Sequence, residues 1–183
     1  MTACQRPRWP FARQNTSLSR VVFGGHVDVA IDGASVAVAG VEIFDIRGYL
    51  RASGWQADVT SASGRNDWAT TYRRDNATMR VHSKSGVGDV EANIAGRRIV
   101  AECKKGPLKR RPGGPEYPLL TTAIGQALLF RADPADIVVA AVPHSETFVR
   151  IADDWRTRPR LIASGIRIAL VKRDGTVCGL DFR

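Results

Sequence analysis

Alternation of apolar and polar residues along the chain predicts a series of short strands and turns. Residues 27–38, VDVAIDGASVAV, alternate on both sides of Asp32-Gly33, and residues 166–182, IRIALVKRDGTVCGLDF, surround Asp174-Gly175. An Asp-Gly pair between two apolar runs is typical of a hairpin turn. The pattern therefore predicts one hairpin near the N-terminus and another at the C-terminus.

Between these hairpins, the apolar positions predict helices and strands in alternation. Residues 41–55 have apolar side chains at helical spacing, and residues 136–143 form a short apolar run that suits a strand buried on both faces. Residues 64–80 are polar and basic and receive no assignment. The expected elements are a helix in 41–55, a strand in 56–62, two strands in 86–106, a helix in 119–130, a strand in 136–143, and a helix that starts at Ser145 and bends near Pro159.

The stretch GVGDVEANIAGRRIVAECKKG, residues 86–106, places charged side chains in two adjoining strands. If Ala95-Gly96 is the turn, Asp89 lies directly opposite Glu102. Period-two alternation then puts Lys104 on the same face as both carboxylates. Glu91 and Val100 share that face, and the residues that point the other way, into the core, are Ile99, Ala101 and Cys103. A register slip of one residue would destroy this arrangement.

Two opposed carboxylates repel each other unless a cation lies between them. A divalent ion is the natural occupant, because Mg²⁺ is typically held by one or two carboxylates together with waters and phosphate oxygens. Each flanking helix adds one polar residue: Glu42 lies on the flank of the apolar stripe in 41–55, and Gln126 falls within the apolar arc of 119–130, where a buried amide needs partners. The ordinary alternatives, a boundary glutamate and an amide bonded to a loop carbonyl, stay open.

The positive charge of the chain is concentrated around these strands. The formal net charge is +9, and residues 65–111 alone hold twelve Lys and Arg against five Asp and Glu, a net charge of +7. Such clustering indicates a polyanionic partner, most often nucleic acid, although a solvated basic face is the alternative. The candidate phosphate contacts are Lys105, Lys109, Arg110, Arg111, Arg73, Arg74 and Lys84.

Length and composition favour a single domain. We expect residues 1–20, which are basic and free of acids, to be a disordered tail, and residues 21–183 to form one domain. No apolar run approaches the ~18 residues of a membrane span. The chain has three cysteines, Cys4, Cys103 and Cys178, an odd number without CxxC spacing. This pattern predicts neither a disulfide nor a zinc site, and it therefore favours a reducing, cytoplasmic location.

Other hydrolytic chemistries lack support in the sequence. There is no GxxxxGK[ST] phosphate loop. The histidines lack the clustered arrangement of a metal-finger nuclease, and we interpret each as incidental; they are His26, His82 and His144.

Taken together, four features resemble the PD-(D/E)XK nuclease superfamily, with its Mrr-like restriction and Holliday-junction-resolvase branches the most similar. These are the helix with Glu42, the Gly88-Asp89 turn, the strand motif Glu102-Cys103-Lys104 and the helix with GQALLF at 125–130. Glu-x-Lys alone is a weak signal, and its specificity comes from the order of all four. The resemblance covers roughly residues 41–142, and Gly88 stands where the motif's name has proline.

The resemblance implies an α/β fold with a restriction-endonuclease-like αβββαβ core, a mixed central sheet flanked by helices, and a Mg²⁺-dependent endodeoxyribonuclease activity. Asp89, Glu102 and the Cys103 carbonyl would bind Mg²⁺, for which Mn²⁺ would substitute. Lys104 would position the nucleophile or balance charge, and the two flanking residues expected at the site are Glu42, through water, and Gln126. The ion would activate a bound water and polarise the scissile phosphate.

Two readings of the function compete with a DNA nuclease. One is a catalytically silent nuclease-fold module that binds nucleic acid or a partner protein, and the other is an RNA-directed nuclease. Substrate shape, biological pathway and oligomeric state, with a homodimer among the options, stay open at this point.

Overall fold

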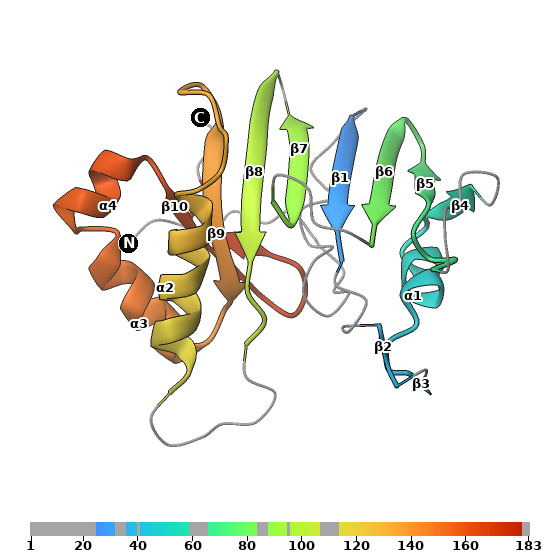
Figure 1. Cartoon of the computed structure of the whole chain (residues 1–183), viewed down its shortest axis with the longest axis horizontal. Helices are drawn as coiled ribbons and strands as arrows, with labels where there is room; N and C mark the ends of the chain where they lie inside the picture. Colours follow the sequence, from blue (N-terminus) through green and yellow to red (C-terminus); the bar gives the residue numbers. More distant parts are fainter. Residues whose placement is uncertain are drawn as a thin grey trace.

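The computed structural model describes residues 25–31, 36–39, 41–58, 66–83, 88–94, 96–106 and 114–180. These residues form a nine-stranded mixed sheet and a separate two-stranded ribbon (Figure 1). The strands are β1 (His26–Ala30), β2 (Ala37–Val38), β3 (Val41–Glu42), β4 (Gln56–Asp58), β5 (Thr71–Arg74), β6 (Ala77–His82), β7 (Val90–Ile94), β8 (Arg97–Cys103), β9 (Ile137–Pro143), β10 (Arg167–Val171) and β11 (Val177–Cys178). The helices are α1 (Ile46–Ala52), α2 (Glu116–Ala127), α3 (Glu146–Trp155) and α4 (Pro159–Ser164).

The strand order in the large sheet is β11-β10-β9-β8-β7-β1-β6-β5-β4, and the ribbon pairs β2 with β3. Strands β8, β9 and β10 are parallel neighbours, whereas β7 is antiparallel to both β8 and β1. Most of β9 is buried, which confirms the expectation of a central strand at 136–143. The expectation of a mixed α/β fold with a mixed central sheet is also confirmed.

The helices cover opposite faces of the sheet. On one face, α2 and α3 pack over β9 and β10 through Leu120 and Phe148, which contact Val142 and Ile168. We call this the α2 face; by strand alternation it also carries Val100 and Glu102. The other face holds the main hydrophobic core, and Ile46 and Leu50 of α1 belong to it together with Tyr72, Met79, Ile99 and Ala101.

The two hairpin predictions had different outcomes. The C-terminal hairpin is confirmed, because β10 and β11 pair antiparallel around Asp174-Gly175. The prediction of an N-terminal hairpin is wrong, since β1 pairs with β6 and β7 instead of with the residues that follow Asp32-Gly33. The alternating pattern correctly marked 26–30 as a strand, but it contains no information on which strand is its neighbour.

Residues 64–80 received no assignment and contain a hairpin. Strands β5 and β6 pair antiparallel with Arg74 opposite Ala77, so Asp75 and Asn76 form the turn. Asp75 has φ +50°, a left-handed conformation that Asp tolerates better than most residues. The buried alternate residues Ala77, Met79 and Val81 were the period-two signal for this strand.

The first helix begins later than its apolar spacing predicts. Asp45 caps α1 and accepts a 2.7 Å hydrogen bond from the backbone N–H of Gly48. Glu42 therefore lies in β3, before the helix, and is exposed. The Ser145 cap of the later helix is confirmed by its bond from the Phe148 N–H, and the chain breaks there into α3 and α4, with Pro159 opening α4.

The place of β4 differs from the expected order of strands. Residues 56–58 do form a strand, but it lies at the edge of the sheet beside β5. The strand predicted at 56–62 comes before β7 in the expected order of elements. In the sheet, the neighbour of β7 is instead β1, from much earlier in the chain.

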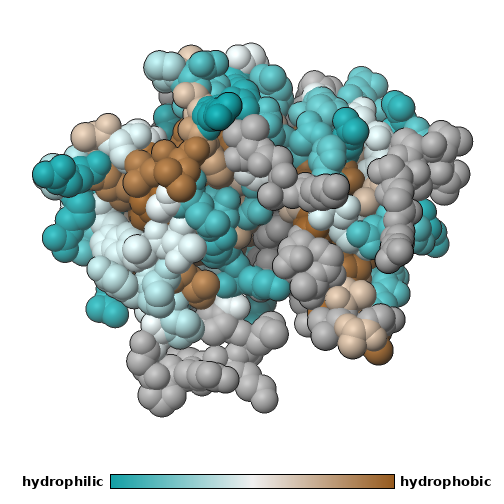
Figure 2. All heavy atoms as spheres, viewed as in Figure 1, coloured by the Kyte–Doolittle hydropathy of each residue, from teal (hydrophilic) through white to brown (hydrophobic). Residues whose placement is uncertain are grey.

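The surface combines one apolar area with polar surroundings. Figure 2 shows hydrophobic atoms gathered at the upper left, where Figure 1 places α4 and the C-terminal end of α2. The large exposed apolar residues of these elements are Leu128, Leu129 and Ile162. Among the described helices, none is long and apolar enough to cross a membrane.

Candidate metal and nucleic-acid site

The register of the β7–β8 hairpin is the one that the sequence predicts. Val90 pairs with Ala101 and Ile94 with Arg97, so the next position outward sets Asp89 against Glu102. On the other face of β8, Ile99 and Ala101 are buried in the main core, with Cys103 packed against it. The predicted register is therefore confirmed for Val90–Ile94, and its continuation by one residue puts Asp89 beside Glu102, whose charge helps to raise the pKa of Asp89.

Asp89 lies in a partly buried and negatively charged place. Burial raises its pKa to about 6, and the nearby Glu102 adds to the rise. Two features work in the opposite direction: a 2.8 Å hydrogen bond from the Cys103 N–H to Asp89 Oδ2 and the positive charge of Lys104. A carboxyl group with this balance readily accepts a cation, which would replace the missing hydration.

Glu102 is the more buried of the two carboxylates, with 7% of its surface exposed. Lys104 Nζ lies 2.5 Å from Glu102 Oε1, so the two residues form an ion pair on the α2 face. The Lys104 backbone N–H donates to the Ala141 carbonyl oxygen at 2.9 Å, which continues the β8–β9 ladder past the end of β8. The three residues Asp89, Glu102 and Lys104 are thus held together by backbone pairing.

The cysteines differ from expectation. Cys103 is a free thiol whose pKa is raised, first by burial and then by the charges of Asp89 and Glu102. Cys178 in β11 is disulfide-bonded, so the expectation of a chain without disulfides is wrong. The cytoplasmic location was inferred from that expectation and stays a prediction.

Gly88 explains how the chain approaches the site without proline. A Cβ atom on Gly88 would meet the Ala101 carbonyl oxygen, Val100 Cγ1 and Phe130 Cζ, each at 3.0 Å. The position before Asp89 is therefore closely surrounded by β8 and by the residue that follows α2. A residue without a side chain fits this space, and proline would bring its own Cβ into the same contacts.

Gln126 and Glu42 are not placed as their sequence patterns predict. The buried stripe of α2 is made of Glu116, Leu120, Ala123 and Ala127, and Gln126 is exposed, so the expectation of a buried amide is wrong. Glu42 lies on the exposed β2–β3 ribbon, and among the described residues no hydrogen bond or ion pair joins it to Asp89 or Glu102.

The donor atoms at Asp89 and Glu102 fit a hard divalent cation. Two carboxylates converge there from adjoining strands, and Mg²⁺ commonly takes one or two carboxylates and completes its shell with water. Within the described ranges, no group of three or more His, Cys, Asp or Glu side chains is arranged to hold a metal ion. Any ion here would therefore depend on water, the Cys103 carbonyl or substrate for its remaining ligands.

The candidate phosphate contacts fall on different surfaces. Arg73 is exposed on the α2 face, where it lies 3.7 Å from Asp58. Arg74 points to the other face; its guanidinium stacks 4.7 Å from the Trp55 ring centre and donates to the Ser53 carbonyl. Lys105 is exposed directly after the site. The other four candidates lie outside the described residues: Lys84, Lys109, Arg110 and Arg111.

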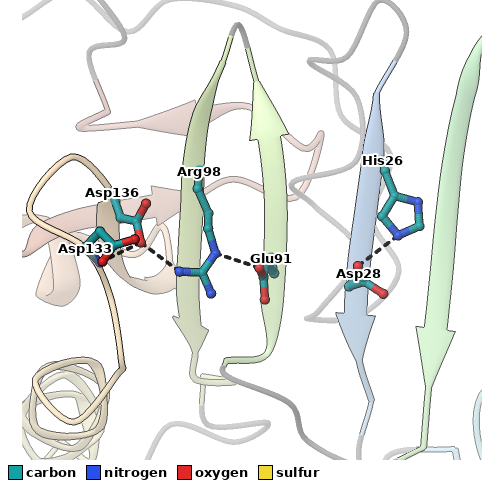
Figure 3. Close-up of polar contacts among 6 residues, drawn as sticks. All are labelled: His26, Asp28, Glu91, Arg98, Asp133 and Asp136. Atoms are coloured by element: carbon teal, nitrogen blue, oxygen red, sulfur yellow. Dashed lines mark hydrogen bonds and ion pairs between the residues drawn. The ribbon is translucent and has the colours of Figure 1, made fainter.

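The α2 face also carries two polar clusters that sequence reasoning missed (Figure 3). Arg98 donates from Nε to Glu91 at 2.6 Å and from Nη1 to Asp136 at 2.7 Å. Asp28 contacts the Nε2 atoms of His26 at 2.9 Å and of His82 at 2.7 Å. The interpretation of these two histidines as incidental overlooked this pairing, because His82 follows Asp28 by 54 residues and the strands meet only in the folded sheet.

Comparisons with protein-family models, with curated proteins and with solved structures found no match to this chain.

Proposed function

We propose that the protein is a metal-dependent nuclease of the PD-(D/E)XK type that hydrolyses phosphodiester bonds of DNA. The observation that carries the proposal is the direct opposition of Asp89 and Glu102, with Lys104 bound to Glu102 on the same face. A chance Glu-x-Lys sequence has no reason to meet an aspartate across a hairpin in this register. The basic surroundings of the site, with a net charge of +7 over residues 65–111, favour a polyanionic substrate.

The order of elements around the site supports the same proposal. Strands β1, β7 and β8 are consecutive antiparallel neighbours, and β9 lies parallel to β8 after a crossover through α2. Along the chain, β7, β8, α2 and β9 follow one another as in the last part of the expected αβββαβ core, whereas β1 precedes α1 and is a neighbour of β7 only in the sheet. In this assignment β1 takes the place that the sequence pattern gave to residues 56–62.

The chain's own residues have distinct roles in this proposal. Asp89 and Glu102 would hold Mg²⁺, which lowers the pKa of a bound water and polarises the scissile phosphate. Lys104 would keep its ammonium near Glu102 until substrate arrives and then donate to a phosphate oxygen. We do not assign it as a base, because its ammonium is ion-paired with Glu102.

The test is cleavage of supercoiled, linear, branched and single-stranded DNA, and of RNA, with Mg²⁺, Mn²⁺ or EDTA. We expect cleavage of DNA that EDTA abolishes and that Glu102→Gln reduces by about 10²–10³-fold, a loss typical of removing one group that stabilises the transition state. Glu146→Gln, on α3 away from the site, is the matched control. Cleavage by Glu102→Gln at the wild-type rate would contradict the proposal.

One observation favours the silent binding module as a second candidate. Lys104 already neutralises Glu102, and the described residues provide no third acidic ligand beside the pair. Asp89→Asn separates the two candidates. A nuclease should lose cleavage with this substitution while binding DNA in EDTA at least as well as wild type, because one repulsive charge is gone. A binding module should show no cleavage in either protein.

A further inference from the structure

Asp28 holds two imidazole rings at once on the α2 face. His82 Nε2 lies 2.7 Å from Asp28 Oδ1, and His26 Nε2 lies 2.9 Å from Asp28 Oδ2. Since a carboxylate only accepts hydrogen bonds, each Nε2 donates, and the remaining nitrogen of each ring is Nδ1. About a third of the side-chain surface of both Asp28 and His82 is exposed. The pair is therefore oriented by hydrogen bonds and accessible to a ligand.

The sheet register places His82 in line with the candidate metal site. The Ala30 N–H donates to the Asp89 carbonyl oxygen at 2.7 Å, so Ala30 follows Asp89 across the sheet. Ala30 is in turn paired with His82 on β6. Glu102, Asp89, Ala30 and His82 thus form one row of side chains on one face. Adjacent strands lie about 4.8 Å apart, so His82 is two strand spacings, about 10 Å, from Asp89.

Only a small side chain separates the two sites along this row. Ala30 is short and itself buried, so no long side chain of this row lies between Asp89 and His82 on the α2 face. Around the pair, Glu91 lies opposite Asp28 on β7 but is bound to Arg98, and Arg80 lies beside Asp28 on β6. A ligand that extends along the row from Asp89 therefore meets His82 next.

We propose that His82, oriented by Asp28, contacts the phosphate one nucleotide away from the phosphate bound at Asp89 and Glu102. This inference rests on the proposed function. A polynucleotide strand presents a phosphate on every nucleotide, and the gap between His82 and Asp89 is reduced by the reach of both side chains. When Nδ1 of His82 donates to a phosphate, both nitrogens of the ring are donors, as in imidazolium. The Asp28 carboxylate balances the positive charge of that ring.

The test uses DNA oligonucleotides that each carry one neutral methylphosphonate, moved one position at a time. Binding is measured by fluorescence anisotropy in EDTA, so the result does not depend on cleavage. His82→Ala should weaken binding of the unmodified strand by about 10-fold, as expected for a hydrogen bond to a charged group. A methylphosphonate at one position should weaken wild-type binding similarly but cause no further loss in His82→Ala.

His26→Ala is the matched control, because His26 binds the same carboxylate but lies two rows away from the row of His82 and Asp89. It should show no such coupling at any position. Asp28→Asn, which retains His82 but loosens its orientation, should reduce the effect at the same phosphate. Equal folding of the variants is checked by urea denaturation.

The outcomes separate this inference from the proposed function. In Mg²⁺, the coupled phosphate should lie one nucleotide from the cleaved bond. Three outcomes overturn the His82 contact. They are cleavage without coupling of any methylphosphonate position to His82, additive losses of affinity at every position, and no binding of any oligonucleotide. Coupling without cleavage supports the contact and rejects the nuclease.

Discussion

Lys104 and Glu102, two residues apart on one face, form an ion pair with 2.5 Å between Nζ and Oε1. The same Glu102 carboxylate is the one that would ligate a metal ion. Lys104 and a divalent cation therefore compete for Glu102, and binding of the ion would release the ammonium toward solvent or substrate. This competition makes the roles of the two residues separable by experiment.

Lys104→Ala should bind Mn²⁺ as tightly as wild type or several-fold more tightly, because the competing ammonium is removed and an ammonium is not a ligand. Its cleavage rate should fall by about 10²–10³-fold, as for loss of a charge that acts on the transition state. Calorimetry with Mn²⁺ beside the cleavage assay measures both quantities. Arg160→Ala, which removes an exposed cation on α4, is the control and should retain cleavage. Loss of Mn²⁺ binding in Lys104→Ala would show that the lysine supports the site in another way.

Asp89→Asn should stabilise the metal-free protein at pH 8. The pKa of Asp89 in the folded state is about 6, above its ordinary 3.8, so ionisation opposes folding at high pH. The full shift would correspond to roughly 3 kcal/mol, but solvent screens this partly exposed group, and we expect about 1 kcal/mol. Asn keeps an oxygen that accepts the hydrogen bond from Cys103.

The sign of this effect fixes its pH dependence. The gain from Asp89→Asn should be fully present above pH 6, shrink as the pH falls from 6 toward 3.8, and vanish below 3.8, where the aspartate is protonated in both states. Urea denaturation in EDTA at pH 8 and at pH 4.5 measures it. A difference in the free energy of unfolding that does not change with pH would contradict the raised pKa.

Arg73 and Arg74 are neighbours in sequence that should differ in their effect on nucleic-acid binding. Arg73 is exposed on the α2 face, so Arg73→Gln should reduce the log–log salt dependence of duplex binding by up to about 0.9. Arg74 is held against Trp55 on the other face, so Arg74→Gln should leave this slope unchanged and lower stability by about 1 kcal/mol. Affinities measured over a range of salt concentrations decide. Equal changes in slope would place the nucleic acid elsewhere.

The register around Asp89 and Glu102 could be predicted because it depends on local information. The pairing of Ile94 with Arg97, next to each other across the end of the hairpin, sets the register, and strand alternation then assigns every side chain to a face. The Ser145 cap and the Asp174-Gly175 hairpin were predictable for the same reason. In each case the partners are close in sequence, and backbone geometry leaves few alternatives.

The rest depended on interactions that the pattern does not contain. Asp45 caps α1 and excludes Glu42 from the helix, although apolar spacing continues on both sides of it. Parallel pairing of β1 with β6 brings His82 to Asp28, and a parallel neighbour carries no turn signal. Gln126 was assigned to a buried arc that α2 does not use, because the position of the sheet beneath the helix decides which stripe is buried.

Gly88→Ala should destabilise the protein and disturb the metal site. A Cβ atom at this position would lie 3.0 Å from a backbone oxygen of β8, which cannot move without shifting the strand, and 3.0 Å from the Phe130 ring. Overpacking of this kind costs about 1–3 kcal/mol. The displacement would fall on Asp89, the next residue, so Mn²⁺ affinity should fall as well.

Gly125→Ala is the matched control for this substitution. Gly125 lies exposed in α2, and nothing surrounds the position of its Cβ within 4 Å. Replacing a helical glycine by alanine at an open position stabilises by roughly 0.5–1 kcal/mol. Urea denaturation should therefore move in opposite directions for the two variants, and Mn²⁺ calorimetry should change only for Gly88→Ala. A Gly88→Ala protein with wild-type stability and metal affinity would show that the chain before Asp89 adapts freely, and that close packing is not what keeps a glycine there.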